Sequence, residues 1–278
     1  MAQRRKKSKK KQTSLTSIVI ALIIVLWGYF AKDGNFDLNS ILPNSNQTLQ
    51  NAQTASASYG GLSDNDYQKL AKLDFKSGSK AFTYVNNDKS TLIKNAWRVN
   101  KVIYSNLDSL NRTSHSNTGF LEKRNLANGS LRVRQYVQPT GWHYNTRNGV
   151  QLYNRGHLIA YSVSAGINAD GKYNPQDQSG DQNNPKNLFT QTAYSNQKIQ
   201  TIYEEKIREA LRADKKVIYQ ATPIFRGNEL MARGINLQAV STDGSLNFNV
   251  YLYNVQPGFS FDYATGRAKT DRSMRVTQ

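Results

Sequence analysis

The residues best suited to chemistry lie in three polar blocks in the second half of the chain. Residues 154–157 read Asn-Arg-Gly-His, residues 184–187 read Asn-Pro-Lys-Asn, and residues 191–197 read Gln-Thr-Ala-Tyr-Ser-Asn-Gln. A histidine can accept a proton, an arginine beside it can hold a phosphate, and amide oxygens can bind a hard cation. Together these groups could hydrolyse a phosphodiester bond.

The net charge of the chain favours an anionic partner. Lys and Arg number 37 against 19 Asp and Glu, a formal charge of +18. Seven basic residues lie within residues 1–12, and residues 32–60 carry a net charge of −1, which leaves +12 for residues 61–278. Such a surplus attracts polyanions of any sequence by steering and counterion release. Nucleic acid, anionic cell-wall polymers and lipid headgroups all satisfy this requirement.

Residues 13–31 are predicted to form a transmembrane signal anchor. The stretch is uncharged, and its mostly apolar part, residues 15–31, is just long enough to cross a hydrocarbon core of roughly 30 Å. The positive-inside rule then puts the basic tail, residues 1–12, in the cytoplasm and the rest of the chain outside the cell. A cleaved signal peptide, which would release the protein, is the alternative. Tyr29 and Phe30 count against it because they crowd the place where cleavage needs small residues.

Residues 32–60 are predicted to be a flexible polar tether, since they are rich in Asn, Gln, Ser and Thr and poor in large apolar residues. Residues 61–278 then form one extracellular domain, which is large enough to bury a core without disulfides. The chain has no cysteine. Thiol catalysis and cysteine-ligated zinc sites are therefore excluded.

The hydrophobic pattern of the domain predicts strands with a few helices between them. Helices are expected over residues 63–75, 96–110 and 199–211, strands over 80–85, 131–137 and 216–225, and a hairpin of 237–240 with 246–255. Turns are expected at residues 86–88 and 241–244. Strands dominate without regular βαβ alternation, so the predicted class is α+β with a mainly antiparallel central sheet and flanking helices.

Four ordered blocks resemble the DNA/RNA non-specific endonuclease family. They are residues 138–143, 154–157, 184–187 and 196–197, within a likeness that covers roughly residues 65–265. Within the family, the chain is similar to the membrane-attached DNA-entry nucleases of Gram-positive bacteria. The resemblance implies a ββα-metal (His-Me finger) motif, in which a β-hairpin with the histidine packs against a helix with a metal-binding asparagine. It also implies Mg²⁺-dependent cleavage of DNA and RNA, with Mn²⁺ as an expected substitute.

Carried over to this sequence, the resemblance makes His157 the general base, Asn196 the direct metal ligand and Asn187 a nearby amide that organises the site. The residue types suit these roles. A histidine with an ordinary pKa of about 6.5 is mostly neutral at physiological pH and can accept a proton from water. One asparagine oxygen suits Mg²⁺, which keeps most of its own waters.

The resemblance also assigns roles to charged residues. Arg155 is expected near the reacting phosphate. Glu204 would reach metal-bound water and Arg208 the phosphate, and their spacing of four puts both on one helix face. Lys123 and Arg124 match a basic pair that relatives use to hold DNA.

Each of these residues also has an ordinary structural interpretation. Asn187 could serve a turn, and Asn196 could cap the helix that follows it. Glu204 and Arg208 could be a solvated helix pair, and the basic pair could be surface charge.

One position departs from the family pattern. Relatives commonly have Asp where this chain has Asn154, so a negative charge next to the base is missing. We expect a shift in the pKa of His157 and in the pH optimum, but not loss of activity. Of the other histidines, His143 is predicted to be structural and His115 to lie in a loop.

The sequence therefore predicts a membrane-anchored, Mg²⁺-dependent endonuclease that cleaves DNA and RNA without sequence preference and leaves 5′-phosphate ends. DNA uptake, degradation of extracellular DNA and scavenging all fit. The alternatives are a non-catalytic tethered receptor for DNA or another anionic polymer, and an enzyme acting on another phosphodiester such as teichoic acid. Nothing in the sequence indicates an obligate protein partner.

Overall fold

The computed structural model describes residues 58–144, 146–147 and 149–278. The predicted cytoplasmic tail, the predicted anchor and most of the predicted tether lie outside these residues. Within the part of the chain that is described, no helix is both long and apolar enough to cross a membrane.

The folded domain begins slightly before the boundary that the sequence predicted at residue 61. Tyr59 packs edge-to-face against Phe120, with ring centroids 5.6 Å apart. Gly60 forms an antiparallel bridge with Leu92. These last residues of the predicted tether are therefore part of the domain.

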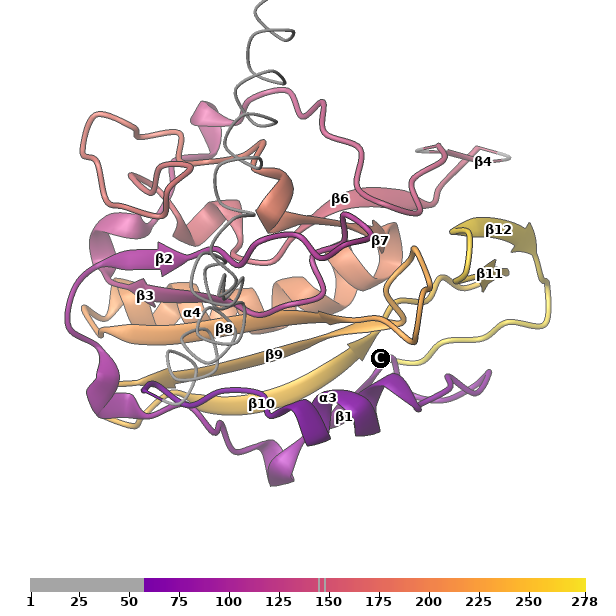
Figure 1. The fold of residues 1–278 in the computed structure, drawn as a ribbon, viewed down its shortest axis with the longest axis horizontal. Coiled ribbons are helices and arrows are strands. Elements are labelled where there is room, and N and C mark those ends of the chain that lie inside the picture. The colour runs from indigo at the N-terminus through magenta and orange to yellow at the C-terminus, as the bar shows by residue number, and fades with distance from the viewer. Residues whose placement is uncertain (1–57, 145, 148) are drawn as a thin grey trace, which may run out of the picture. The chain divides into compact units, whose positions relative to one another are not determined.

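A six-stranded antiparallel sheet forms the centre of the domain (Figure 1). In spatial order its strands are β1 (Phe82–Tyr84), β10 (Asn247–Tyr253), β9 (Gly234–Ser241), β8 (Val217–Ile224), β3 (Asn117–Leu121) and β2 (Lys101–Ile103). Every neighbouring pair is antiparallel. The predicted α+β class with a mainly antiparallel sheet is confirmed.

Three two-stranded antiparallel sheets stand outside this sheet. They are β4 (Thr146–Arg147) with β5 (Val150–Gln151), β6 (Tyr153–His157) with β7 (Leu188–Thr192), and β11 (Phe259–Asp262) with β12 (Arg267–Thr270). Figure 1 shows β6 and β7 on one side of the large sheet and the β11–β12 hairpin at its end.

The described residues contain two α-helices, α3 (Asp64–Ala71) and α4 (Thr201–Arg212). Ser63 caps α3, because its hydroxyl accepts a hydrogen bond from the Asp66 N–H at 3.1 Å. A π-helical turn, η8 (Ser195–Gln200), runs directly into α4. The 3₁₀ turns are η2 (Asn86–Asp88), η3 (Lys94–Ala96), η4 (Lys123–Asn125), η5 (Gly129–Leu131), η6 (Tyr161–Val163) and η7 (Pro185–Asn187).

Alternating side chains of the large sheet pack into separate cores on its two faces. Tyr219 of β8 belongs to the same buried cluster as Ile207 of α4. The preceding residue, Ile218, belongs to a different cluster. A third cluster joins Leu70 of α3 to Tyr251 of β10. Because successive strand residues point to opposite faces, a sheet covered on both faces is buried along nearly every residue.

The predicted helix over residues 96–110 is wrong. After η3 the chain forms β2, whose Val102 pairs with Gly119 of β3 and is buried. Asn100 fixes this conformation, because its buried side-chain amide donates to the Phe120 carbonyl at 2.7 Å. β-Branched residues at helical spacing suit a strand equally well, and tertiary pairing decided between the two.

The predicted strand over residues 131–137 is also wrong, although this segment, here called the strap, leaves η5 in an extended conformation. Its backbone bonds to side chains rather than to another strand. The Val133 N–H donates to Gln182 Oε1 at 3.1 Å, and the Tyr136 N–H donates to Asn183 Oδ1 at 3.1 Å. Side-chain amides of another loop therefore replace the ladder partner that a strand requires.

Candidate active site

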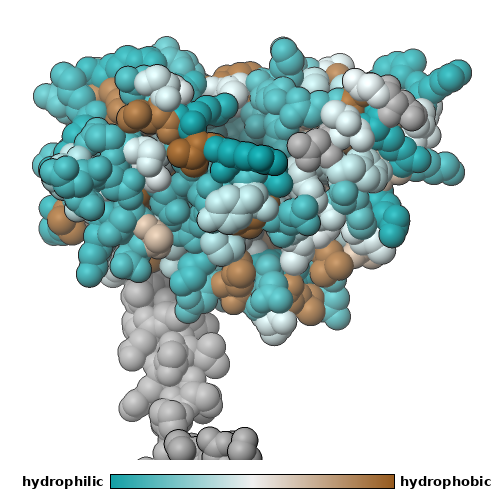
Figure 2. Space-filling view, turned by 90° about the horizontal axis from the view of Figure 1, so that it is seen from above, coloured by the Kyte–Doolittle hydropathy of each residue, from teal (hydrophilic) through white to brown (hydrophobic). Residues whose placement is uncertain are grey.

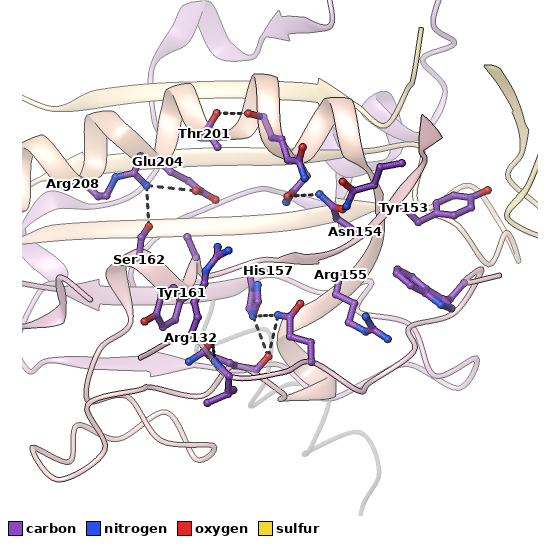
Figure 3. Close-up of a pocket in the computed structure, with 18 residues that line it drawn as sticks. Arg132, Tyr153, Asn154, Arg155, His157, Tyr161, Ser162, Thr201, Glu204 and Arg208 are labelled. Atoms are coloured by element: carbon purple, nitrogen blue, oxygen red, sulfur yellow. Dashed lines mark hydrogen bonds and ion pairs between the residues drawn. The ribbon is translucent and has the colours of Figure 1, made fainter. Parts of the chain in front are cut away.

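A cleft of about 540 Å³ lies beside β6, η8 and α4. Five of the predicted site residues line it: Arg155, His157, Asn196, Glu204 and Arg208. Figure 3 shows Arg155 and His157 on β6 and Glu204 and Arg208 on α4. Asn196 comes from η8. The cleft therefore joins residues that are up to about fifty positions apart in the sequence.

The order of elements explains how the histidine and the asparagine meet. β6 ends at His157 and pairs with β7, so that Asn154 lies opposite Gln191. The chain then turns from β7 into η8, which carries Asn196. A strand pair followed by a helix thus brings His157 and Asn196 to the same cleft. Single π-helical turns often occur at functional sites, and here one supplies the candidate metal ligand.

His157 is held through Nε2. This nitrogen lies 3.2 Å from the backbone oxygen of Gln182 and 3.2 Å from the side-chain amide of Gln135. A carbonyl can only accept, whereas an amide group can offer either atom, so the Gln182 carbonyl selects the tautomer with the proton on Nε2. The lone pair then lies on Nδ1, which is the nitrogen able to accept a proton.

Burial lowers the pKa of His157 to about 4. The hydrogen bond to Gln182 opposes this effect, and the positive charge of Arg132 adds to it. The imidazole is therefore neutral at physiological pH, which is the form a general base needs.

Only glycine fits at position 156, between Arg155 and His157. A Cβ at Gly156 would lie 2.3 Å from Oε1 of Gln191 and 2.8 Å from the ring of Phe189, both on the paired strand. A side chain here would displace Gln191, so the glycine of the motif answers a packing requirement.

Asn196 is oriented at both ends of its amide. Its Nδ2 donates to Oε1 of Gln191 at 2.9 Å, and its Oδ1 accepts from Nδ2 of Asn154 at 2.9 Å. Its side chain caps nothing in η8. The helix-cap interpretation is therefore wrong, and the oxygen of Asn196 is held in a fixed direction.

A chain of buried amides continues from Asn196 to the far side of the cleft. Gln191 donates to Gln200 Oε1 at 2.9 Å. The Gln200 amide then donates to the backbone oxygen of His157 at 3.0 Å and to Oε1 of Glu204 at 2.8 Å. Both glutamines are fully buried. This network ties the strand of the base to the helix of the candidate ligand.

Glu204 and Arg208 share one face of α4, as predicted, and both line the cleft. Burial raises the pKa of Glu204, while the Gln200 hydrogen bond and the nearby arginines oppose this rise. Arg208 lies 3.6 Å from Glu204 and 2.5 Å from Glu205, and it donates to Ser162 Oγ at 2.9 Å. The guanidinium of Arg208 is thus already surrounded by partners.

Arg155 lines the cleft, but its guanidinium is engaged away from the base. It stacks on Trp142, with Cζ 4.6 Å from the ring centroid, and its Nε donates to the Val137 carbonyl. Figure 3 shows it extending away from His157.

Asn187 lies outside the cleft and is fully buried. Its Oδ1 accepts from the Ile159 N–H at 2.9 Å, and its Nδ2 donates to the Ile159 carbonyl at 3.0 Å. Asn187 thus holds the chain just beyond His157, which agrees with an organising role rather than contact with substrate.

Lys123 and Arg124 also lie outside the cleft. Arg124 forms an ion pair with Glu122, and its Cζ lies 4.1 Å from the ring centroid of Tyr173. Their predicted role in holding DNA stays a prediction.

The remaining histidines lie outside the cleft as well. Nε2 of His143 lies 2.7 Å from the Thr265 carbonyl in the turn between β11 and β12. This contact fits the predicted structural role. His115 is exposed in a loop.

Comparison with known proteins decides the family. The family model described as DNA/RNA non-specific endonuclease matches residues 90–243, more than half of the chain. The chain belongs to the DNA/RNA non-specific endonuclease family. This membership confirms the class of enzyme that the sequence predicted, a nuclease.

Solved structures of a similar protein agree. The nuclease NucA from Streptococcus agalactiae, solved without metal, is 30% identical, with a TM-score of 0.59 over 75% of this chain and 98% of NucA. The same protein solved with a magnesium ion is 27% identical, with a TM-score of 0.59 over 75% of this chain and 97% of NucA. A curated deoxyribonuclease of Streptococcus dysgalactiae subsp. equisimilis is 38% identical over 58 residues, which span 21% of this chain and 18% of that protein.

Four residues of the site in this nuclease could not be predicted from the sequence. Gln191 and Gln200 belong to the buried amide network, Gln182 contacts His157, and Arg132 lines the cleft. Gln191 lies in one of the three polar blocks, but nothing in a single sequence indicates its bonding. Gln182 contacts His157 through its backbone, so its side chain carries no signal for that contact.

Proposed function

We propose that this chain is a metal-dependent endonuclease that hydrolyses DNA and RNA without sequence preference and leaves 5′-phosphate ends. The observation that carries the proposal is the convergence of His157 and Asn196 on one cleft. Hydrolysis of an anionic diester requires a deprotonated water, relief of added negative charge and protonation of the leaving oxygen. The residues of the cleft suit the first two requirements.

In this proposal, His157 takes the proton from the attacking water through Nδ1. Its neutral state follows from burial, and its tautomer from the Gln182 carbonyl. Gln182 and the Gln200 bond to the His157 backbone hold the ring and its strand in place. A base that is fixed before substrate arrives needs no reorganisation during the reaction.

The donor set of the cleft fits a hard divalent ion. Asn196 offers a neutral oxygen whose direction is fixed by Gln191, and Glu204 offers a carboxylate in the same cleft. Among the described residues, no group of three His, Cys, Asp or Glu could hold a metal. A site with few protein oxygens suits Mg²⁺, which retains several waters, and Mn²⁺ is expected to substitute. When bound, the ion would supply positive charge at the phosphate and an acidic water for the 3′ oxygen.

The arrangement of β6, β7, η8 and α4 supports the proposed ββα-metal motif. The magnesium ion bound in one of the NucA structures supports the choice of ion. The face in Figure 2 is mostly hydrophilic, with apolar residues in small separate groups. The net charge of +12 over residues 61–278 supports a polyanionic substrate.

The test is incubation of supercoiled plasmid with the protein and Mg²⁺, with and without EDTA. We expect nicking that EDTA abolishes, and the same with Mn²⁺ and with a structured RNA. Products should accept a kinase label only after phosphatase treatment, because their 5′ ends carry phosphate. Tight binding without cleavage would favour the receptor alternative, and cleavage of teichoic acid alone would favour the third.

Two variants test the base. His157→Ala should remain folded and bind DNA but not nick it. His157→Gly should regain part of the cutting when imidazole is added, because the missing group is a proton acceptor. Full activity of His157→Ala would refute the proposed role of this residue.

We further propose that the domain works outside the cell on an uncleaved anchor formed by residues 13–31. The charge of residues 1–12 and the apolar run that follows support this location. Fractionation of cells that express the full chain should recover it in the membrane at full mass, and external protease should digest the domain in intact cells. A shorter form in the medium would instead indicate cleavage and secretion.

A further inference from the structure

Three arginines line the cleft, and they differ in how fully their charge is already engaged. Arg208 contacts Glu204 and Glu205. Arg155 stacks on Trp142 and donates to a backbone carbonyl. Arg132 has no carboxylate within ion-pair distance in the described part of the chain, so its positive charge is available to a ligand.

Arg132 comes from the strap, and a single residue fixes the backbone on both sides of it. Gln182 Nε2 donates to the carbonyl of Leu131 at 3.0 Å, and Gln182 Oε1 accepts from the N–H of Val133 at 3.1 Å. The Gln182 side chain is buried, with 5% of the residue exposed. The direction in which Arg132 leaves the strap is therefore set by a packed side chain.

The Arg132 side chain lies on the base side of the cleft. Its Cζ lies 5.6 Å from the ring centroid of Tyr161. Figure 3 shows Arg132 extending beside Tyr161 on the same side of the cleft as His157. Its charge reaches two of the groups in the cleft, since it contributes to the pKa shifts of both His157 and Glu204, although burial is the larger cause in each.

We propose that Arg132 is a catalytic residue that binds a non-bridging oxygen of the phosphodiester being cleaved, and that Gln182 positions it. A guanidinium matches phosphate oxygens with two donors, and an uncompensated charge in a cleft stabilises the additional negative charge of the transition state. Gln182 thus contacts the proposed base, His157, through its backbone oxygen. Its side chain holds the backbone on both sides of Arg132. This inference rests on the proposed function.

The experiment compares Arg132→Ala with Arg134→Ala in steady-state cleavage of a duplex DNA. Arg134 is the matched control because it is an exposed arginine of the same strap that does not line the cleft. We expect Arg132→Ala to lower kcat about 100-fold. Arg134→Ala should leave kcat within about threefold of wild type, since an exposed charge outside the cleft acts mainly on binding. Equal kcat values for the two variants would overturn the proposal.

Further variants separate charge from folding. Arg132→Lys keeps a positive charge without the two-donor geometry, so it should recover part of the lost kcat. Arg132→Gln keeps most of the stem, and it replaces the alanine variant if that protein melts early. If Arg132→Gln is folded and cleaves like wild type, the proposal is wrong.

A binding measurement distinguishes this inference from the proposed function. In EDTA, the affinity of wild type for a short duplex should fall with salt, and Arg132→Ala should reduce that slope by about 1. If wild type never cleaves but the slope falls, the nuclease proposal fails while Arg132 remains a phosphate contact. An unchanged slope together with unchanged kcat would overturn the role of Arg132 alone.

Discussion

Nδ2 of Asn154 donates a hydrogen bond to Oδ1 of Asn196, and the two atoms lie 2.9 Å apart. An aspartate, the residue that the family resemblance leads us to expect at this position, could not donate this bond. The oxygen that we propose as the metal ligand is thus partly satisfied by a neighbour that carries no charge. We therefore expect the asparagine at position 154 to affect the proposed metal site as well as the histidine.

Asn154→Asp should tighten the binding of Mg²⁺. The substitution adds a negative charge near the proposed ligand and frees its oxygen, and we expect the dissociation constant to fall about 10-fold. Calorimetric titration with Mg²⁺ or Mn²⁺ in the absence of DNA measures the change. Asn154→Ala is the control, because it frees the oxygen without adding charge. Equal affinities of the two variants would show that charge has no effect here.

Gly156→Ala should destabilise the domain and weaken the metal site together. The added methyl would meet Oε1 of Gln191, the atom that orients Asn196. We expect a loss of about 1–3 kcal/mol in the free energy of unfolding, as for overpacked sites. Urea unfolding and metal titration measure the two effects. Gly129→Ala is the matched control, because open space surrounds Gly129; equal stability of the two variants would contradict the packing argument.

The imidazole of His157 should titrate well below the ordinary range. Its pKa is lowered to about 4, first by burial, so NMR of the metal-free protein should give a midpoint near that value. Since the folded pKa lies below the unfolded value of about 6.5, the folded state binds fewer protons in between. Stability should therefore fall as the pH drops from about 6.5 to about 4. A midpoint between 6 and 7 would contradict the burial of the ring.

Asn187→Ala should act through the backbone next to the base. It would leave the buried N–H and carbonyl of Ile159 without their side-chain partner, at a cost of about 2–4 kcal/mol. Cleavage per folded molecule should fall while Mg²⁺ affinity is kept, since Asn196 is not touched. Asn187→Asp keeps the acceptor for the Ile159 N–H but sets a buried carboxylate oxygen against the Ile159 carbonyl, so it should be at least as destabilising. Wild-type unfolding midpoints in urea would rule out this structural role.

The parts of the fold that the sequence predicted well are those with unambiguous patterns. β8 lies within one residue at each end of its predicted strand, and the predicted hairpin is β9 with β10. The amphipathic stripe predicted α4, although the helical path begins earlier, at Ala193. Turns rich in Asn, Asp and Gly were placed correctly, since they adopt positive φ at residues such as Asn87 and Gly244.

The failures have a common physical cause, which is bonding to distant residues. Val102 pairs with Gly119, and the strap bonds to Gln182 and Asn183, about fifty residues later. Hydrophobic spacing cannot report either partner. In the site, His157 and Asn196 could be predicted because they belong to ordered motifs. Arg132 follows a glycine-containing turn and belongs to no motif. The pattern of residues 131–137 indicates only a strand with a basic face.

The strap has a further consequence for how this enzyme could diversify. Its peptide groups are secured by two amide side chains that belong to another loop, Gln182 and Asn183. Because these bonds go to the backbone of the strap, its side chains can be exchanged without loosening the attachment. Libraries confined to positions 131, 133, 134, 136 and 137, with Arg132 and Gln135 kept, offer a route to altered substrate preference with the hydrolytic centre left intact.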